Sequence, residues 1–130
     1  MNDNLINKKA KYEELAQKTT TQYRKDMKAI KGIIEVIENN GEIKEDDTFE
    51  TIVFKKYLEL ENVKKVADYV NQLGYRIKTN SYIGERKYIG NDISEIIINK
   101  DCLVEKKLKT IVQSLQYKNY EAMSKIWREY

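Results

Sequence analysis

The sequence contains no histidine, no proline and a single cysteine, Cys102, in 130 residues. Histidine is the commonest general base and the commonest zinc ligand, so its absence argues against many hydrolytic and metal-dependent mechanisms. One cysteine cannot form an internal disulfide or a cysteine-rich metal site. The five glycines are scattered and form no phosphate-binding loop. We therefore expect no enzymatic activity, no cofactor and no metal.

Long apolar runs are also missing, and the longest, such as residues 96–98, are far too short to cross a bilayer. The first residues lack the apolar stretch of a secretion signal. We therefore expect a cytoplasmic protein with no membrane contact. The 41% of apolar residues suffice for one folded domain, whereas the net charge of +3 is too small to indicate a nucleic-acid partner by itself.

Residues 1–41 are expected to form a helical arm, either as one long helix or as two shorter ones. Apolar residues recur every three or four positions, which is the period of one helix face. The threonines at positions 19–21 mark the point where two helices could separate, because threonine is a poor helix former. The end of this stripe is expected either to pack on the following helices or to form a homodimer interface through Ile30, Ile33, Ile34 and Ile37.

Residues 48–130 are expected to form a helical domain. Its first helix follows Asp47, the predicted N-cap, and its second follows Asn62 and ends at Gly74. Residues 76–90 lose the helical period and contain glycines with alternating β-branched and aromatic residues, which predicts a loop or small β-hairpin. The predicted fold class is therefore mainly α, with five or six helices and a winged-helix or helix-turn-helix arrangement. Further helix starts are predicted at Asn91 or Asp92, at Asp101 and at Asn119.

Positive charge is concentrated in residues 76–88, which carry four Lys/Arg and one acid. Lys and Arg bind phosphates, while Asn, Ser and Arg reach base edges. A helix-turn-helix protein braces one helix on the DNA backbone and inserts the next into the major groove. Residues 63–99 supply a helix, a basic loop and a short second helix, and are the predicted segment for binding duplex DNA. The expected phosphate ligands are Arg76, Lys78, Arg86 and Lys87, and the expected contacts to bases or sugars are Asn80, Tyr82, Tyr88, Asn91 and Ser94.

The pairs Val66-Ala67 and Val70-Asn71, the triplet Gly74-Tyr75-Arg76 and residues 93–99 occur in this order. In this order they resemble the winged-helix segment of large serine recombinases. The resemblance covers residues 63–99 and implies a small DNA-binding protein of a phage, plasmid or other mobile element. The recombinase catalytic domain is not part of it, so no strand transfer is implied. Asp92 and Glu95 depart from the pattern, because they place negative charge on the expected reading helix.

Two alternatives remain open at this point. Residues 12–41 are similar to the helix-turn-helix of bacterial regulators, although the usual turn with its glycine is missing and one continuous helix fits the pattern equally well. The other alternative is a helical module that binds a protein partner and no nucleic acid. An adaptor, or a phage-encoded inhibitor of a host system, would be such a module.

Overall fold

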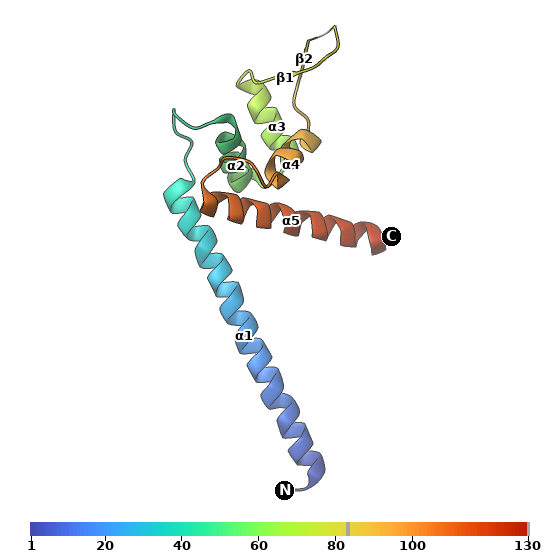
Figure 1. Ribbon diagram of the computed structural model, residues 1–130. Helices are drawn as coiled ribbons and strands as arrows, with labels where there is room; N and C mark the ends of the chain where they lie inside the picture. The colour runs from blue at the N-terminus through green and yellow to red at the C-terminus, as the bar shows by residue number, and fades with distance from the viewer. Residues whose placement is uncertain (83, 130) are drawn as a thin grey trace. The chain divides into compact units, whose positions relative to one another are not determined.

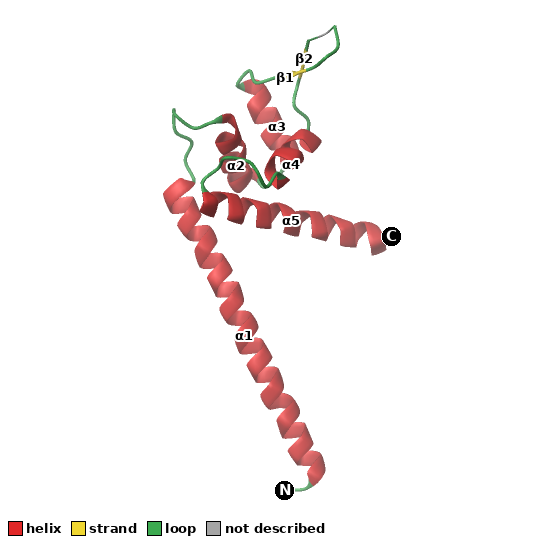
Figure 2. Cartoon of the chain, viewed as in Figure 1, coloured by secondary structure: helices red, strands yellow, loops and turns green. Residues whose placement is uncertain are grey.

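The computed structural model describes the backbone of residues 1–82 and 84–129 and the side chains of residues 1–82 and 84–119. Within this part the chain forms five α-helices and one two-stranded antiparallel sheet (Figures 1 and 2). The predicted fold class is thus confirmed in its coarse form, mainly α with a small hairpin. The chain divides into two units, Met1–Glu35 and Val36–Tyr130. None of the described helices is long and apolar enough to cross a membrane.

The N-terminal region is one continuous helix, α1 (Asp3–Asn40). The threonines at positions 19–21 do not interrupt it. The Thr20 hydroxyl donates to the Ala16 carbonyl at 2.9 Å, so its polar group is satisfied inside the helix. Of the two arrangements that the sequence allowed, the structure shows the single long helix.

The second unit buries one hydrophobic core among four helices, which Figure 1 shows gathered together. Helix α3 packs against α2 and α4, and α5 packs against the same two helices. Apolar residues at helical spacing on each of them supply the buried side chains. The bounds are α2 (Phe49–Leu60), α3 (Val63–Gln72), α4 (Gly90–Ile98) and α5 (Lys106–Glu129). The fully buried side chains include Val53, Phe54 and Tyr57 of α2, Val66 and Val70 of α3, Ile93 and Ile97 of α4, and Leu108 and Val112 of α5.

The start of α2 differs from the prediction. Thr48, not Asp47, is the N-cap, and its hydroxyl oxygen accepts the Thr51 N–H at 3.3 Å. Asp47 instead binds the buried side chain of Lys55, with 2.7 Å between Oδ2 and Nζ. Lys55 also donates to the Glu42 carbonyl at 2.8 Å. This ion pair joins the acidic linker to α2, and the Asp47 carboxylate also accepts the Lys44 N–H at 2.8 Å, so it binds the linker and Lys55 and not the first turn of α2.

The predicted starts of the later helices are confirmed for α3 and wrong for α4 and α5. Asn62 does cap α3, because its side chain accepts the Lys65 N–H at 3.0 Å. Helix α4 begins at Gly90 with Ile89 at the N-cap position, so the predicted caps Asn91 and Asp92 are wrong and lie within its first turn. Helix α5 begins after Glu105, whose carboxylate accepts the Leu108 N–H at 2.9 Å. The predicted starts at Asp101 and Asn119 are therefore wrong, and α5 runs through the second of these positions.

The segment between α3 and α4 contains the small hairpin that the sequence predicted. Strands β1 (Ile77–Lys78) and β2 (Glu85–Arg86) pair antiparallel, with Ile77 opposite Arg86 and Lys78 opposite Glu85. The Thr79 N–H closes the ladder by donating to the Gly84 carbonyl at 2.8 Å. Figure 1 shows this hairpin projecting away from the helices of its unit.

Candidate nucleic-acid interface

Helices α2 and α3 are joined by a very short turn, made of Glu61 and Asn62. Glu61 ends α2 in the left-handed conformation, with φ 47° and ψ 36°, and its N–H donates to the Tyr57 carbonyl at 2.8 Å. Asn62 then caps α3 directly. A short turn between two packed helices occurs in ordinary αα-hairpins as well as in helix-turn-helix motifs.

The outward side of α3 carries four polar residues, which we call the α3 face. Helical spacing places them together, opposite the buried Val66 and Val70. The first turn supplies two ammonium groups, and the following turns supply a carboxylate and an amide. The members of the α3 face are Lys64, Lys65, Asp68 and Gln72, and all four are exposed.

The hairpin is fastened to α3 through Asn71. The Asn71 amide nitrogen donates to the Tyr88 carbonyl at 2.9 Å, and its amide oxygen accepts the Tyr88 N–H at 2.8 Å. The Arg76 guanidinium binds the chain on the other side of the hairpin, donating to the Asn71 carbonyl at 3.0 Å and to the Tyr75 carbonyl at 2.6 Å. Both ends of the hairpin are therefore held at the C-terminal end of α3.

Aromatic packing supports the same junction. The Phe49 ring lies 4.6 Å from the Tyr75 ring and 5.1 Å from the Tyr88 ring, measured between centroids. Tyr88 is half-buried. Its burial, together with the charge of Asp92, raises the pKa of the Tyr88 hydroxyl. Of the predicted DNA contacts, Tyr88 thus lies in the packing between the hairpin and α2.

The four predicted phosphate ligands fall into two kinds. Arg76 is half-buried and binds backbone carbonyls, as described above. Arg86 forms two hydrogen bonds of 2.8 Å to the two carboxylate oxygens of Asp92. These bonds raise the pKa of Arg86 and lower that of Asp92. Lys78 and Lys87 are exposed, and no ion pair holds either of them in the part of the chain that the structure describes.

The remaining predicted contacts are also divided. Asn80 and Tyr82 lie exposed in the hairpin loop, where the Tyr82 side chain is 100% accessible. Asn91 is exposed in the first turn of α4. Ser94 instead lies half-buried on the side of α4 that faces α5, where its hydroxyl accepts from the Gln116 amide at 3.1 Å. Ser94 is therefore part of the packing between two helices.

The outer side of α4 is acidic. Asp92 and Glu95 line a hollow of about 420 Å³ between the hairpin and α4, together with the guanidinium of Arg86. The Arg86 charge is matched by its ion pair with Asp92. Carboxylates repel phosphates unless they accept from cytosine. Beyond this ion pair, α4 presents the exposed carboxylate of Glu95 and carries no Lys or Arg, which is unfavourable for the reading role that the sequence predicted for this helix.

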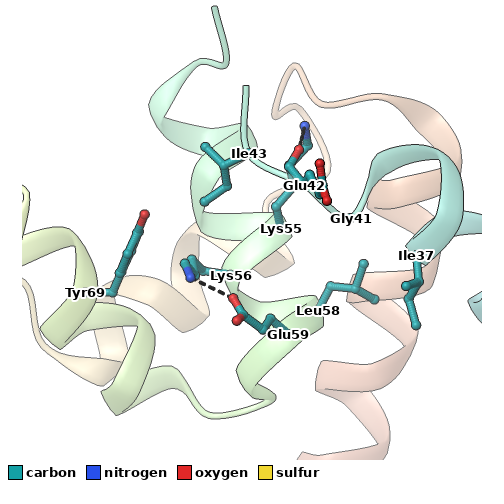
Figure 3. A pocket seen from close by; sticks show the side chains of 9 residues that line it. All are labelled: Ile37, Gly41, Glu42, Ile43, Lys55, Lys56, Leu58, Glu59 and Tyr69. Carbon is teal, nitrogen blue, oxygen red and sulfur yellow. Dashed lines mark hydrogen bonds and ion pairs between the residues drawn. The ribbon is translucent and has the colours of Figure 1, made fainter. Parts of the chain in front are cut away.

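A second hollow, of about 690 Å³, lies beside α2 (Figure 3). Its lining combines apolar side chains such as Ile37 and Leu58 with charged ones. The Lys56 ammonium lies 2.7 Å from the Glu59 carboxylate and 4.2 Å from the centroid of the Tyr69 ring. Because these charges are matched within the hollow, it is poorly suited to a phosphate.

Comparisons with known proteins do not identify a relative. No protein-family model, no curated protein and no solved structure matches this chain. Lys64 and Lys65 were not among the predicted DNA contacts. They become candidates because they lie in the first turn of α3, directly after the turn at Glu61. The capping residue Asn62 and the lysine pair behind it were the signal available in the sequence.

Proposed function

We propose that this protein binds duplex DNA, with α3 in the major groove and the β1–β2 hairpin on the adjacent phosphates. The observation that carries the proposal is the two-residue turn at Glu61 and Asn62, after which α3 presents its polar face to solvent. In a helix-turn-helix protein the first residues of the second helix contact the base edges. Here these residues are Lys64 and Lys65, whose ammonium groups we assign to the phosphates that flank the groove when the duplex has no preferred sequence.

The local charge favours this surface. Residues 62–91 carry six Lys/Arg against two Asp/Glu. Two of the six are the arginines that bind the protein itself, so four lysines are available to phosphates. Neutralising about four phosphates corresponds to a slope of about −3.6 in a plot of log affinity against log salt. The four exposed lysines are Lys64, Lys65, Lys78 and Lys87.

The hairpin loop adds uncharged contacts. Asn80 and the Tyr82 hydroxyl are exposed at its tip, and amide and phenol groups commonly bind phosphate oxygens. Since the hairpin is fastened to α3 by Asn71, its contacts and those of the α3 face have a fixed separation. Such a fixed separation favours a single docking position along the duplex.

The experiment is fluorescence anisotropy with a random duplex over a series of salt concentrations. We expect the double variant Lys64→Ala, Lys65→Ala to bind more weakly and to lower the salt slope by about 2. Its melting temperature should stay the same, because both side chains are exposed. The matched control is Lys100→Ala with Lys106→Ala, which removes the same charge from exposed positions outside this surface. Equal losses in the two double variants would contradict the assignment of α3.

A helical module that binds a protein partner is the second candidate. The hollow beside α2 favours it, because Ile37 is about half exposed there and Ile43 also lines it. This candidate predicts no shift of duplex DNA even at low salt, and a protein partner that stays bound at high salt. The anisotropy series therefore separates the two functions in one experiment.

A further inference from the structure

The unit Met1–Glu35 is helical from Asp3 onward and almost entirely exposed. All of its residues are exposed except Met27, Gly32 and Ile33, which are half-buried. Long helices in proteins gain most of their stability from the packing of an apolar face. This helix has such a face, and the question is which surface packs against it.

The apolar face is a straight stripe along the helix. At 100° per residue its members all lie within about 60° of one line. Leu5, Tyr12, Tyr23 and Ile30 are between 50% and 63% exposed, as expected for side chains with no covering partner. The stripe, as we define it, consists of Leu5, Lys8, Lys9, Tyr12, Ala16, Thr19, Tyr23, Asp26, Met27, Ile30 and Ile34, together with Met1, which precedes the first helical residue. Leu15, which is 54% exposed, lies at the edge of the stripe at the same helical angle as Ile33.

The predicted dimer residues are divided by this arrangement. Ile30 and Ile34 belong to the stripe and are about half exposed. Ile33 lies at its edge and is half-buried. Ile37 belongs to the second unit, where it lines the hollow shown in Figure 3. A surface for self-association would therefore extend along the whole stripe and not be confined to the four isoleucines.

The stripe is complementary to itself when two copies run antiparallel. If positions whose numbers add up to 35 lie opposite each other, every member of the stripe faces another member. The large residues then meet large residues, and the two smallest meet near the middle. The uncharged pairs are Met1 with Ile34, Leu5 with Ile30, Tyr12 with Tyr23, and Ala16 with Thr19. Lys8 faces Met27, and Lys9 faces Asp26.

The charges of the stripe select the same arrangement. The antiparallel register places Asp26 opposite Lys9, with Lys8 beside it. A parallel pair in register would place each of these charges against its own copy, which is unfavourable. Shifting the antiparallel register by seven residues would place Asp26 opposite Ala16 or Asn2 and leave the lysines unmatched.

The contacts that these charges make within one helix are compatible with such pairing. Lys9 lies 3.4 Å from Glu13, and both side chains are about two-thirds exposed. Asp26 accepts from the Gln22 amide at 2.9 Å at an exposed position. Exposed contacts of this kind contribute little to stability, so they can be exchanged for contacts with a second helix.

We propose that Met1–Glu35 pairs with the same segment of a second copy of this chain as an antiparallel two-helix coiled coil. The pairing covers the full stripe, which is about 50 Å long at 1.5 Å per residue. The inference does not rest on DNA binding.

The test measures the dissociation constant of the full chain by analytical ultracentrifugation without DNA. Each single variant, Lys9→Asp or Asp26→Lys, turns two attractive pairs per dimer into repulsive ones and is expected to weaken the dimer about tenfold. The double variant exchanges the two charges and should restore wild-type affinity. The control Lys25→Asp alters a charge about 140° away from the stripe line and should leave the dimer unchanged.

Orientation is tested independently by disulfide formation in a Cys102→Ala background. A mixture of the Tyr12→Cys and Tyr23→Cys chains should give mainly the mixed disulfide, since these positions are opposite only in the antiparallel register. Homodisulfides of each chain would indicate a parallel pair and overturn the proposal. A monomer at all concentrations, or a double variant that fails to recover, would also overturn it. The Lys64→Ala, Lys65→Ala variant should remain dimeric, which separates this test from that of DNA binding.

Discussion

One side chain makes both hydrogen bonds between α3 and the Tyr88 backbone, so Asn71→Ala is the most informative substitution at the junction of α3 and the hairpin. The Asn71 amide makes two hydrogen bonds of 2.8 and 2.9 Å with the backbone of Tyr88. Alanine retains the helix but removes both. The Tyr88 N–H and carbonyl then lose their partners at a half-buried position. The expected result is a hairpin that detaches from α3 while the helical core remains folded.

The size of the effect follows from these two bonds. A neutral intramolecular hydrogen bond contributes about 0.5–1.5 kcal/mol net, so two of them give a loss of about 2 kcal/mol in the free energy of unfolding. For a unit of this size, 1 kcal/mol corresponds to roughly 4–8 °C in melting temperature. We therefore expect the melting temperature of Asn71→Ala to fall by about 8–16 °C.

The assay combines urea denaturation with amide hydrogen exchange at Tyr88. Exchange of this amide should accelerate far more than exchange of amides in α2, since the hairpin opens locally. Asn80→Ala, in the exposed loop, is the control and should change the free energy of unfolding by less than about 0.5 kcal/mol. An Asn71→Ala protein that lost less than this, with unchanged exchange at Tyr88, would refute the reasoning.

Four further predictions concern charges and the turn. Asp47→Ala should lower the free energy of unfolding by about 3 kcal/mol in urea denaturation, because it leaves the buried Lys55 ammonium without its carboxylate. Arg86→Ala should lower the melting temperature measured by circular dichroism, because Asp92 loses both of its hydrogen bonds from arginine. The pKa values of Asp47 and Asp92 lie below the usual 3.8, so a pH titration should show their stabilisation intact above about pH 4 and lost as the pH falls through the folded-state values. Glu61→Gly should raise the free energy of unfolding by up to about 1 kcal/mol, because glycine adopts the left-handed conformation without strain.

The features that could be predicted from the sequence are those that depend on residues close together along the chain. The apolar period identified the buried faces, the cap at Asn62 identified the start of α3, and the loss of period located the hairpin. The predicted break at Asn119 was wrong because its amide binds the Tyr57 hydroxyl at 2.7 Å, 62 positions away in sequence. Ser94 was predicted to contact DNA because the residues near it in sequence do not reveal its partner. That partner is Gln116, which lies on another helix. Contacts of this range leave no periodic signal.

The division of the cations follows from the chemistry of the two side chains. The guanidinium is a planar fork that fits a carboxylate with two parallel bonds, and Arg86 meets Asp92 in this way. A lysine offers a single strongly hydrated charge on a flexible stem, so burial in such contacts is less favourable and exposure to phosphates is more so. In the hairpin segment, Arg76 and Arg86 bind the protein itself while Lys78 and Lys87 are exposed. Counting charges along the sequence treats the two residue types as equal. Because the arginines are occupied, the proposed DNA-binding surface consists of the lysines of the hairpin together with those of α3.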